Sequence, residues 1–436
     1  SIHITHISCS CNHMHVVLTP AAAHGSMQPP ASKSLSHRAV ICAGLADGIS
    51  HIQNVAGSRD LQATISCMEA LGAVITQENG TTVVQGCSPA DLNHPACLDA
   101  YESGSTLRFF IPIAAASKEP IAFHGQPSLL SRPMGIYADL FLSQGLKFAQ
   151  SPEQIDLQGP LSSGIFQIPG NISSQFVSGL LLAAPLLKGE SAIAVLPPYE
   201  SKSYVDLTVD MMKRFGVQVQ EPSSHGYEVP AGQRYKAQDL TVEGDYSQAA
   251  FFAVWAAISG KITLLDMNPQ SLQGDAVILK QLEKAGAKVE WNGNNVTIEK
   301  GNLQPQILDL ADCPDLGPIL CVLAAYTPGQ TKLIHAARLR YKECDRIAAM
   351  EEELKKWNVN ITSDEDSITI EGKESWSAKQ PVLMDGHNDH RIVMAMSIFT
   401  LCSQSKGEIC GAKAITKSYP GFFEDLMKLN VKVSEI

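Results

Sequence analysis

The sequence lacks the features that mark secreted and membrane proteins. No apolar run reaches the roughly 18 residues that a membrane-spanning helix requires. The N-terminal segment has neither the apolar core of a signal peptide nor the Arg-rich pattern of a transit peptide. We therefore expect a cytoplasmic protein that does not bind a membrane.

Several common catalytic motifs are also missing. The sequence contains no GxSxG element, no Walker A motif, no HExxH pair and no GxGxxG segment that opens a βαβ unit. These motifs place a nucleophilic serine, a nucleotide phosphate, a catalytic zinc ion and a dinucleotide, respectively. The chemistry of this chain must therefore depend on other combinations of residues.

Basic residues are too few for a general polyanion-binding surface. There are 33 Lys and Arg residues against 44 Asp and Glu residues, which gives a net charge of −11 and a pI near 5.6. Nucleic acids and anionic membranes both require a basic surface, so we expect neither as a partner. Small anionic substrates remain compatible with this composition, because they respond to local rather than global charge.

Length and composition predict a globular protein of more than one domain. At about 150 residues per domain, a chain of 436 residues corresponds to two or three domains. Apolar residues make up 44% of the chain and charged residues 18%, which is typical of a protein with a large interior.

Cysteine usage indicates neither a disulfide framework nor a metal centre. The eleven cysteines form no CxxC pair, and Cys42, Cys321 and Cys402 lie within apolar runs, so we expect buried free thiols. Residues 1–15 are interpreted as an N-terminal extension, with Met14 as a natural start. This extension contains side chains of metal-ligand type whose spacing matches no closed zinc site: His3, His6, Cys9, Cys11, His13 and His15.

The most informative positive feature is a sixfold repeat of about 70 residues. In each copy a helix-like stretch ends in Gly or Asn, and a short alternating apolar strand follows. The six terminating residues are Gly72, Gly145, Gly216, Gly286, Asn358 and Asn430, with separations of 73, 71, 70, 72 and 72 residues. Gly and Asn tolerate the left-handed conformation just past a helix end, so each is predicted to end a helix before a strand.

A second repeated element is a strongly apolar helix that begins in small polar or ionisable residues. These helices are predicted at Leu35–Ala46, Thr106–Ala116, Gln175–Leu187, Gln248–Ile258, Leu316–Tyr326 and Arg391–Leu401. Helices that are apolar on all sides are buried, and their unpaired N-terminal N–H groups favour anions. Ordinary N-capping by Ser and Asp explains any single start, whereas six starts in phase favour an anion-binding role.

One segment near the N-terminus combines three groups suited to phosphate. Lys33 and Ser34 fall at the start of a predicted helix, and Arg38 follows about one turn later. An ammonium, a hydroxyl and a guanidinium group at a helix N-terminus suit a phosphate or carboxylate ligand. The alternative is a solvated surface face, which the following apolar run disfavours.

Similar combinations recur along the chain. Gly104 would let a ligand approach the backbone, and Arg108 follows it by about one turn. The remaining candidates are polar or charged residues in short motifs: Arg132, Ser173, Ser174, Gln175, Tyr204, Asp315, Lys342, Glu343, Arg346, His390, Arg391 and Lys417.

Taken in order, these motifs resemble those of the 5-enolpyruvylshikimate-3-phosphate synthase family of enolpyruvyl transferases. The resemblance extends from about Val16 to the C-terminus. It is carried by the segments PPASKSLSHRA, SGSTLR, SRPMG, SSQFVSGLLLAAP, SKSYVDLT, EGDYSQAAFF, PDLGPIL, KECDR, NDHR and TKSYPGFF.

The resemblance implies an α/β fold of two domains. Each domain would contain three βαβαββ repeats, with helix N-termini facing an interdomain cleft that holds the active site. One domain would comprise residues 16–31 and 243–436 and hold both termini, and residues 32–242 would form an inserted second domain.

The resemblance also implies a reaction and its substrates. The enolpyruvyl group of phosphoenolpyruvate is transferred to the 5-hydroxyl of shikimate 3-phosphate, with release of phosphate, through a tetrahedral intermediate. No metal or organic cofactor is implied, and a monomer is expected. The implied contacts of shikimate 3-phosphate are Lys33, Ser34, Arg38, Ser173, Ser174, Tyr204, Asp315 and Lys342. The implied contacts of phosphoenolpyruvate are Lys33, Gly104, Arg132, Gln175, Arg346, Arg391 and Lys417.

Four of these residues are implied to be catalytic. Asp315 would orient or deprotonate the 5-hydroxyl. Glu343 would protonate the methylene carbon and later remove that proton. Lys33 would contact both ligands, and His390 would assist through hydrogen bonding.

The chain departs from the common pattern of this family at three positions. Glu102 and Arg338 each stand where the family often has Asn, and Ser105 replaces the usual Thr. A carboxylate at Glu102 beside an anion site would weaken anion binding. Glu102 and Arg338 are therefore not included among the expected site residues.

Two alternatives remain open. The related enolpyruvyl transferase that acts on UDP-N-acetylglucosamine typically uses a cysteine in the loop before the corresponding Arg-Pro pair, and residues 125–131 contain no cysteine here. The second alternative is a catalytically inactive anion-binding relative. The presence of Lys33, Asp315, Glu343 and His390 together argues against it.

Overall fold

The computed structural model describes residues 14–436, which divide into two compact units. Unit 1 comprises the chain up to Pro30 together with Gly244–Ile436, and unit 2 comprises Ala31–Glu243. His15, which the sequence places in the extension, is the first residue of strand β1. The other proposed ligand types of the extension, from His3 to His13, lie outside the described residues.

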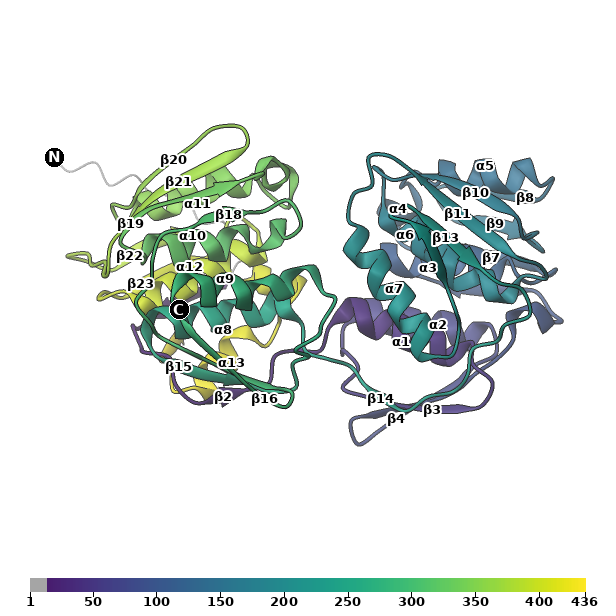
Figure 1. Cartoon of the computed structure of the whole chain (residues 1–436), viewed down its shortest axis with the longest axis horizontal. Coiled ribbons are helices and arrows are strands. Elements are labelled where there is room, and N and C mark those ends of the chain that lie inside the picture. The colour runs from purple at the N-terminus through teal and green to yellow at the C-terminus, as the bar shows by residue number, and fades with distance from the viewer. Residues whose placement is uncertain (1–13) are drawn as a thin grey trace. The chain divides into compact units, whose positions relative to one another are not determined.

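Each unit contains three four-stranded sheets (Figure 1). The sheets of unit 1, in spatial order, are β22 (Val382–Asp385), β23 (Gly407–Cys410), β1 (His15–Leu18) and β24 (Val433–Glu435); β16 (Lys288–Asn292), β17 (Asn295–Glu299), β15 (Lys261–Leu264) and β2 (Ser26–Met27); and β18 (Ile307–Asp309), β19 (Gly329–Ile334), β21 (Ser367–Gly372) and β20 (Asn360–Ser363).

The sheets of unit 2 follow the same plan. In spatial order they are β14 (Leu240–Thr241), β3 (Ile49–Gln53), β5 (Thr81–Gln85) and β4 (Val74–Glu78); β6 (Ala96–Asp99), β7 (Pro120–His124), β9 (Ile155–Gln158) and β8 (Lys147–Gln150); and β10 (Ile165–Pro169), β11 (Ser191–Leu196), β13 (Gly226–Val229) and β12 (Gln220–Ser223). Each of the six sheets has one parallel strand pair at one edge and two antiparallel pairs.

Two short strands are contributed from a distant part of the chain at the points where it passes between the units. Strand β2 lies just before unit 2 in sequence and pairs in parallel with β15, whereas β14 lies just before the return to unit 1 and pairs in parallel with β3. Within unit 1, the Asp245 N–H donates to the Pro30 carbonyl at 2.8 Å. Within unit 2, the Ser32 N–H donates to the Glu243 carbonyl at 2.9 Å. Within each unit, the residue where the chain leaves and the residue where it returns therefore lie side by side.

Six helices are buried along almost their whole length and form the interior of the two units (Figure 1). They are α1 (Lys33–Gly44), α3 (Gly104–Ala114) and α6 (Ser174–Ala183) in unit 2, and α8 (Tyr246–Ser259), α10 (Gly317–Ala325) and α12 (His390–Cys402) in unit 1. Their apolar side chains point in all directions, which requires burial. Each predicted apolar helix is confirmed, with a start within two residues of the observed one.

Outer helices bury one side only, as an amphipathic sequence requires. In α5, for example, Tyr137 and Phe141 are buried while most other positions are accessible. These helices are α2 (Arg59–Ala70), α4 (Pro127–Leu130), α5 (Gly135–Ser143), α7 (Lys202–Arg214), α9 (Val277–Ala285), α11 (Arg346–Lys355) and α13 (Phe422–Lys428). Short 3-10 helices occur at η1 (Pro89–Asp91), η2 (Ala184–Leu186), η3 (Gly274–Ala276), η4 (Pro314–Leu316), η5 (Ala337–Tyr341) and η6 (Ala412–Lys417).

The six repeated Gly and Asn residues all adopt the left-handed conformation predicted for them. Their φ angles are 115° at Gly72, 70° at Gly145, 81° at Gly216, 118° at Gly286, 65° at Asn358 and 64° at Asn430. Each follows a helix and precedes a strand within four residues. The periodicity therefore marks a backbone requirement at these positions, since side chains other than Gly and Asn seldom adopt this conformation.

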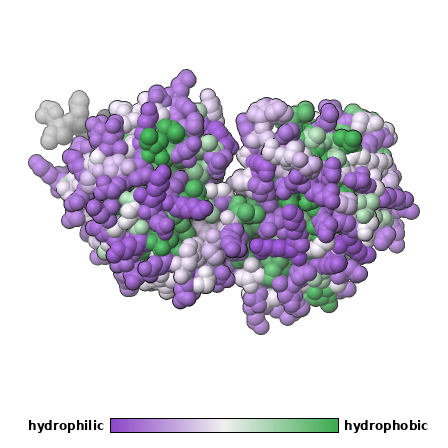
Figure 2. Space-filling model, in the orientation of Figure 1, coloured by the Kyte–Doolittle hydropathy of each residue, from purple (hydrophilic) through white to green (hydrophobic). Residues whose placement is uncertain are grey.

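The cysteines and the surface agree with most of the sequence analysis. Cys42 and Cys321 are buried free thiols, and Cys402 is a half-buried free thiol. Two described cysteines depart from the expectation of buried free thiols: Cys97 is an exposed free thiol, and Cys410 is disulfide-bonded. No helix within residues 14–436 is long and apolar enough to cross a bilayer. On the face drawn in Figure 2, hydrophobic areas are small and separated by hydrophilic residues.

Candidate active-site residues in each unit

In most of the six buried helices, the N-cap is the residue just before the helix, and the polar residues of the first turn come after it. Five of the six have a side-chain N-cap that accepts a hydrogen bond from a backbone N–H: Ser32, Ser103, Ser173, Asp245 and Asp389. Helix α10 instead follows the short helix η4, which contains Asp315. In five of these helices N-capping therefore accounts for one polar residue, and it leaves Ser34, Ser105 and Ser247 for other contacts.

In unit 1, the Asp315 carboxylate lies among three cationic side chains. Its Oδ1 is 3.1 Å from Nη1 of Arg346 and 3.6 Å from Nζ of Lys342, and its Oδ2 is 4.0 Å from Nη2 of Arg391. Burial alone would raise the pKa of Asp315, but Arg391, Lys342 and Arg346 together lower it to about 2. Asp315 is therefore ionised at neutral pH and able to accept a proton or a hydrogen bond.

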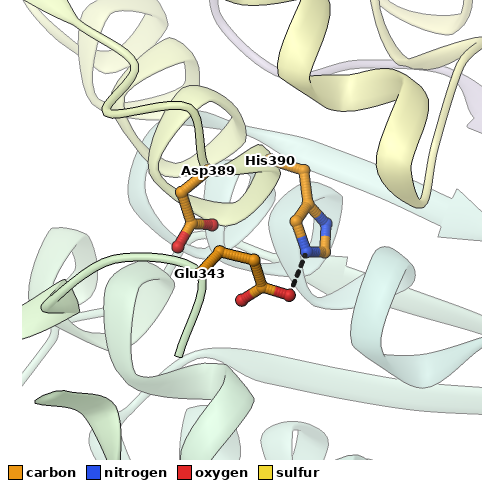
Figure 3. A group of neighbouring side chains, drawn as sticks. All are labelled: Glu343, Asp389 and His390. Atoms are coloured by element: carbon orange, nitrogen blue, oxygen red, sulfur yellow. Dashed lines mark ion pairs between the residues drawn. The ribbon is translucent and has the colours of Figure 1, made fainter. Parts of the chain in front are cut away.

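Glu343 is the second predicted catalytic carboxylate, and it lies beside His390 (Figure 3). Its Oε1 is 3.6 Å from Nε2 of His390, and its Oε2 is 2.5 Å from Nη2 of Arg346. The interaction with His390, opposed by burial and aided by Arg346, holds the pKa of Glu343 well below its usual range. Burial lowers the pKa of His390, against the opposite effect of its contact with Glu343.

Arg346 connects these groups to a buried carboxylate that the sequence did not assign. Its Nε donates to Oδ2 of Asp389 at 2.8 Å, and both side chains are almost completely buried. Asp389 also caps α12 by accepting from the Arg391 N–H at 2.9 Å. The Lys417 ammonium donates to the carbonyl of Asn388, next to Asp389. The seven predicted site residues of unit 1 are therefore joined through a few direct contacts.

A second unassigned carboxylate, Asp275, lies close to this group. The Ser247 hydroxyl donates to Asp275 Oδ2 at 2.5 Å, near the start of α8. Burial and the nearby Asp315 raise the pKa of Asp275 to about 6, against an opposite effect of Arg391. Asp275 is therefore protonated more readily than an ordinary aspartate, and its hydrogen bond with Ser247 fixes the N-terminus of α8.

Oxygen and nitrogen atoms of Glu343, Asp389 and His390 lie within 4.8 Å of one another, a spacing that a metal ion could use (Figure 3). However, the Arg346 guanidinium already contacts both carboxylates of this group. A cation at this position would face a fixed positive charge. The residues fit proton transfer better than metal binding.

In unit 2, Arg38 is held rigidly between α1 and α7. Its Nε donates to the Thr208 hydroxyl at 2.7 Å, Nη1 to the Ser34 carbonyl at 2.9 Å and Nη2 to the Tyr204 carbonyl at 3.2 Å. Its guanidinium also lies 5.1 Å from the centre of the Phe109 ring. Lys33 and Ser34 form the first two positions of α1, and the Tyr204 side chain is 42% exposed on α7. Four predicted contacts of shikimate 3-phosphate are therefore neighbours on two packed helices.

The starts of α3 and α6 form a second polar group in unit 2. Gln175 donates through Nε2 to the Ser105 hydroxyl at 2.6 Å, and its Oε1 accepts from Nη1 of Arg108 at 2.6 Å. The hydroxyl of Ser173 accepts from the Gln175 N–H at 3.2 Å. These contacts fix the amide orientation of Gln175, because one end receives a donor and the other meets an acceptor. Ser174 is the first residue of α6.

Gly104 is the residue that lets Arg132 approach this group. A Cβ atom at position 104 would lie 2.5 Å from Nη1 of Arg132 and 3.3 Å from Nη1 of Arg108. Any larger side chain would therefore displace Arg132. Burial, together with repulsion from the neighbouring Arg132 guanidinium, lowers the pKa of Arg108, and an anion bound here would relieve that repulsion.

Asp389, Asp275 and Ser247 were not among the expected site residues, and Arg108 was noted beside Gly104 without an assigned role. Arg108 and Asp389 stand within the motifs SGSTLR and NDHR, which are the available sequence signals. Two residues that differ from the common family pattern were not included in the expected site. Glu102 is exposed, and Nη1 of Arg338 contacts the Ala311 carbonyl at 3.4 Å. Each unit thus presents cations and hydrogen-bond donors suited to phosphates and carboxylates, and unit 1 adds two carboxylates able to move protons.

Comparison with known protein families gives one consistent result. A family model described as EPSP synthase (3-phosphoshikimate 1-carboxyvinyltransferase) matches residues 17–426. Relatives named 3-phosphoshikimate 1-carboxyvinyltransferase from Clostridium kluyveri and Clostridium novyi are each 39% identical to this chain. The first alignment covers 97% of this chain and 98% of the relative, and the second covers 96% and 98%.

Solved structures agree with the sequence comparison. An EPSP synthase from Acinetobacter baumannii matches with a TM-score of 0.84 and 28% identity, over 97% of this chain and 100% of that chain. The enolpyruvyl transferase NikO from Streptomyces tendae matches with a TM-score of 0.71 over 97% of this chain and 99% of that chain. At 14% identity, NikO supports the fold alone. The α/β enolpyruvyl transferase fold and the resemblance inferred from the sequence are confirmed.

Proposed function

The chain belongs to the EPSP synthase (3-phosphoshikimate 1-carboxyvinyltransferase) family and has its activity in the shikimate pathway, and we propose how its residues carry out that reaction. Phosphoenolpyruvate donates its enolpyruvyl group to the 5-hydroxyl of shikimate 3-phosphate, and inorganic phosphate leaves. The observation that carries the residue assignment is the direct linkage of Asp315 and Glu343 through one buried arginine, Arg346.

We assign substrate contacts to residues in each of the two units. Lys33, Ser34, Arg38 and Tyr204 contact shikimate 3-phosphate from unit 2, together with Ser173 and Ser174. From unit 1, Lys342 and Asp315 contact the same substrate. Phosphoenolpyruvate is bound by Lys33, Gly104, Arg132, Gln175, Arg346, Arg391 and Lys417. The charge-assisted hydrogen bonds of this set suit the phosphate and carboxylate that each substrate carries.

Addition begins at the 5-hydroxyl. Asp315 is ionised, as its low pKa requires, and accepts the hydroxyl proton while the oxygen attacks the substituted carbon of phosphoenolpyruvate. Glu343 delivers a proton to the methylene carbon, which becomes a methyl group. The tetrahedral intermediate carries phosphate and carboxylate on one carbon, and the surrounding guanidinium groups stabilise both.

Elimination reverses the role of Glu343. Its carboxylate removes a proton from the methyl group as the C–O bond to phosphate breaks, and the leaving phosphate receives the proton held by Asp315. The lowered pKa keeps Glu343 ionised, as this second role requires. For the first role, the bound substrate anions must raise that pKa by competing for Arg346 and adding negative charge nearby.

A phosphate-release assay tests the function. Phosphoenolpyruvate is supplied with shikimate 3-phosphate, with UDP-N-acetylglucosamine, or alone. Release with shikimate 3-phosphate only is expected. Release with the nucleotide sugar would favour the related transferase, and the absence of release in all three mixtures would favour an anion-binding protein without catalysis.

A further inference from the structure

Glu353 is a buried carboxylate on α11 that the reaction scheme does not use. Its side chain is 0% exposed, and no apolar environment tolerates such a charge without partners. Its Oε1 accepts from Nζ of Lys356 at 2.7 Å and from the Asp385 N–H at 2.9 Å. Its Oε2 lies 2.6 Å from Nε2 of His387. Two of its three partners belong to one turn, residues 385–388.

This turn leads directly to the reactive groups of unit 1. It connects β22 to α12, which begins with His390 and Arg391. His387 and Asn388 both have positive φ angles, 54° and 50°, so the backbone is strained there and needs external contacts to hold it. The carbonyl of Asn388 receives the Lys417 ammonium. The shape of the turn therefore sets where Lys417, His390 and Arg391 lie.

Helix α11 holds this turn and the following cap at two points. Arg346, at its first position, binds Asp389, and Glu353, seven residues later, binds Asp385 and His387. Seven residues correspond to about two helical turns, so both side chains project from the same face of α11. A single rigid helix thus fixes both the beginning and the end of the turn.

We propose that Glu353 and His387 form a positioning pair, which holds the 385–388 turn so that His390, Arg391 and Lys417 are placed for the reaction. The proposal rests on the proposed function of those three residues. Neither Glu353 nor His387 touches the substrates in this scheme. Removing their contact therefore lowers activity through displacement of other groups.

The pair also predicts a pH dependence. The hydrogen bond to Glu353 raises the pKa of His387 despite burial, and Asp385 and Glu352 act in the same direction. Glu352 Oε2 is 3.6 Å from Nε2 of His387, and Lys356 also pairs with Glu353, with its Nζ 2.7 Å from Oε1. The ion pair between protonated His387 and Glu353 is therefore lost as the pH rises through the raised pKa of His387.

A cation could in principle use the oxygen and nitrogen atoms of Glu352, Glu353 and His387, which lie within 4.8 Å of one another. The Lys356 ammonium already contacts Glu353 at 2.7 Å, so the site has its own positive charge. Lys356, His387 and the Asp385 N–H together satisfy the Glu353 carboxylate, and no metal is needed to balance its charge.

The test compares four variants of the full chain with the wild type. Glu353→Gln keeps the side-chain shape and removes the charge. His387→Asn removes the imidazole but suits a positive φ angle. His387→Lys retains a cation that does not titrate near neutral pH. Lys356→Met is the matched control, because it removes the partner of Glu353 that lies outside the turn.

We expect kcat to fall by about 10-fold or more in Glu353→Gln and His387→Asn, since small displacements of reactive groups can cost up to ~10²-fold. His387→Lys should recover activity and lack the alkaline decline of the wild type, and Lys356→Met should match the wild type. Melting temperatures measured in parallel separate unfolding from displacement. Wild-type kcat and an unchanged alkaline limb in both Glu353→Gln and His387→Asn would overturn the proposal.

Histidine NMR distinguishes failure of this inference from failure of the proposed function. The His387 imidazole should titrate above its ordinary pKa in the wild type and near it in Glu353→Gln, while the signals of His390 shift. A wild-type protein that releases no phosphate would refute the proposed function and, with it, the catalytic consequence assigned to the pair. An active wild type with identical His390 signals in both proteins would refute the positioning role alone.

Discussion

The guanidinium group of Arg346 contacts both oxygens of the Asp389 carboxylate, with Nε 2.8 Å from Oδ2 and Nη2 3.2 Å from Oδ1. Both side chains are buried, with exposed fractions of 2% and 0%. The same guanidinium reaches Asp315 and Glu343, so one cation lies between three carboxylates. Such a fork-shaped pair fixes geometry as well as charge.

Replacing Arg346 tests the energetic importance of this pair. Arg346→Met leaves the Asp389 carboxylate buried without its charged partner, and breaking a buried ion pair in this way typically costs about 3–5 kcal/mol. Urea unfolding of the variant should show this loss in the free energy of unfolding. The double variant with Asp389→Asn keeps a good N-cap residue and removes the unpaired charge, so it should recover part of the loss. A single variant as stable as the wild type would contradict the prediction.

Neutralising either catalytic carboxylate should abolish most activity without unfolding the protein. Glu343→Gln and Asp315→Asn keep the side-chain shape but remove the group that transfers the proton, so kcat should fall by at least ~10²-fold. Steady-state phosphate release measures the effect, and circular dichroism checks the fold. Near-normal turnover in either variant would refute the role assigned to that residue.

No described cysteine beside the active-site motifs should be required for activity. Burial raises the pKa of Cys313 and of Cys344 to about 12, so neither thiol forms a nucleophilic thiolate at neutral pH. Cys344 donates to Asp389 at 3.3 Å, a contact that serine can also make. The double variant Cys313→Ser, Cys344→Ser should therefore retain its kcat. A folded but inactive double variant would require covalent chemistry to be reconsidered.

The low pKa of Asp315 predicts part of the acid sensitivity of unit 1. A carboxyl whose pKa falls on folding stabilises the native state above its unfolded pKa near 4, and this stabilisation disappears as the pH falls toward 2. The contribution is on the order of 2 kcal/mol. Unfolding free energies measured between pH 5 and pH 2 should fall less steeply for Asp315→Asn than for the wild type. Parallel curves would show that Asp315 has an ordinary pKa.

The contact between Ser105 and Gln175 predicts a specific effect on phosphoenolpyruvate binding. Ser105→Ala removes the acceptor of the Gln175 amide, and losing a hydrogen bond of about 0.5–1.5 kcal/mol raises KM roughly two- to tenfold. Ser105→Thr retains the hydroxyl and serves as the control, with a KM near the wild-type value. The KM for phosphoenolpyruvate is measured at saturating shikimate 3-phosphate. Equal KM values for the Ala and Thr variants would argue against a role for this hydrogen bond.

Local features of the sequence predicted the repeating framework well. Gly72 and Asn430 illustrate this, because a left-handed residue after a helix is a requirement of the backbone at that one position. The apolar helix that became α8 was equally visible, since nearly every residue from Tyr246 to Ile258 is buried. The family resemblance added the site residues, which no local pattern identifies by role.

Contacts between distant segments could not be predicted in this way. Arg38 and its partner Thr208 are 170 residues apart, and Arg346 and Asp389 are 43 residues apart. Each contact exists only because two helices pack side by side. Ser247 and Asp275 are a further case, since a capping role would explain either residue when it is considered alone.

Unit 2 is an insertion in the chain of unit 1. Pro30 and Asp245, on either side of the insertion, are joined by a backbone hydrogen bond, and Ser32 and Glu243 are joined in the same way within unit 2. A gene in which codon 30 is fused to codon 244 would encode unit 1 with all three of its sheets, because the exchanged strand β2 remains with it. The reciprocal fragment, residues 31–243, retains β14 and is likewise complete. Each unit thus keeps its own three sheets and its own share of the charged residues.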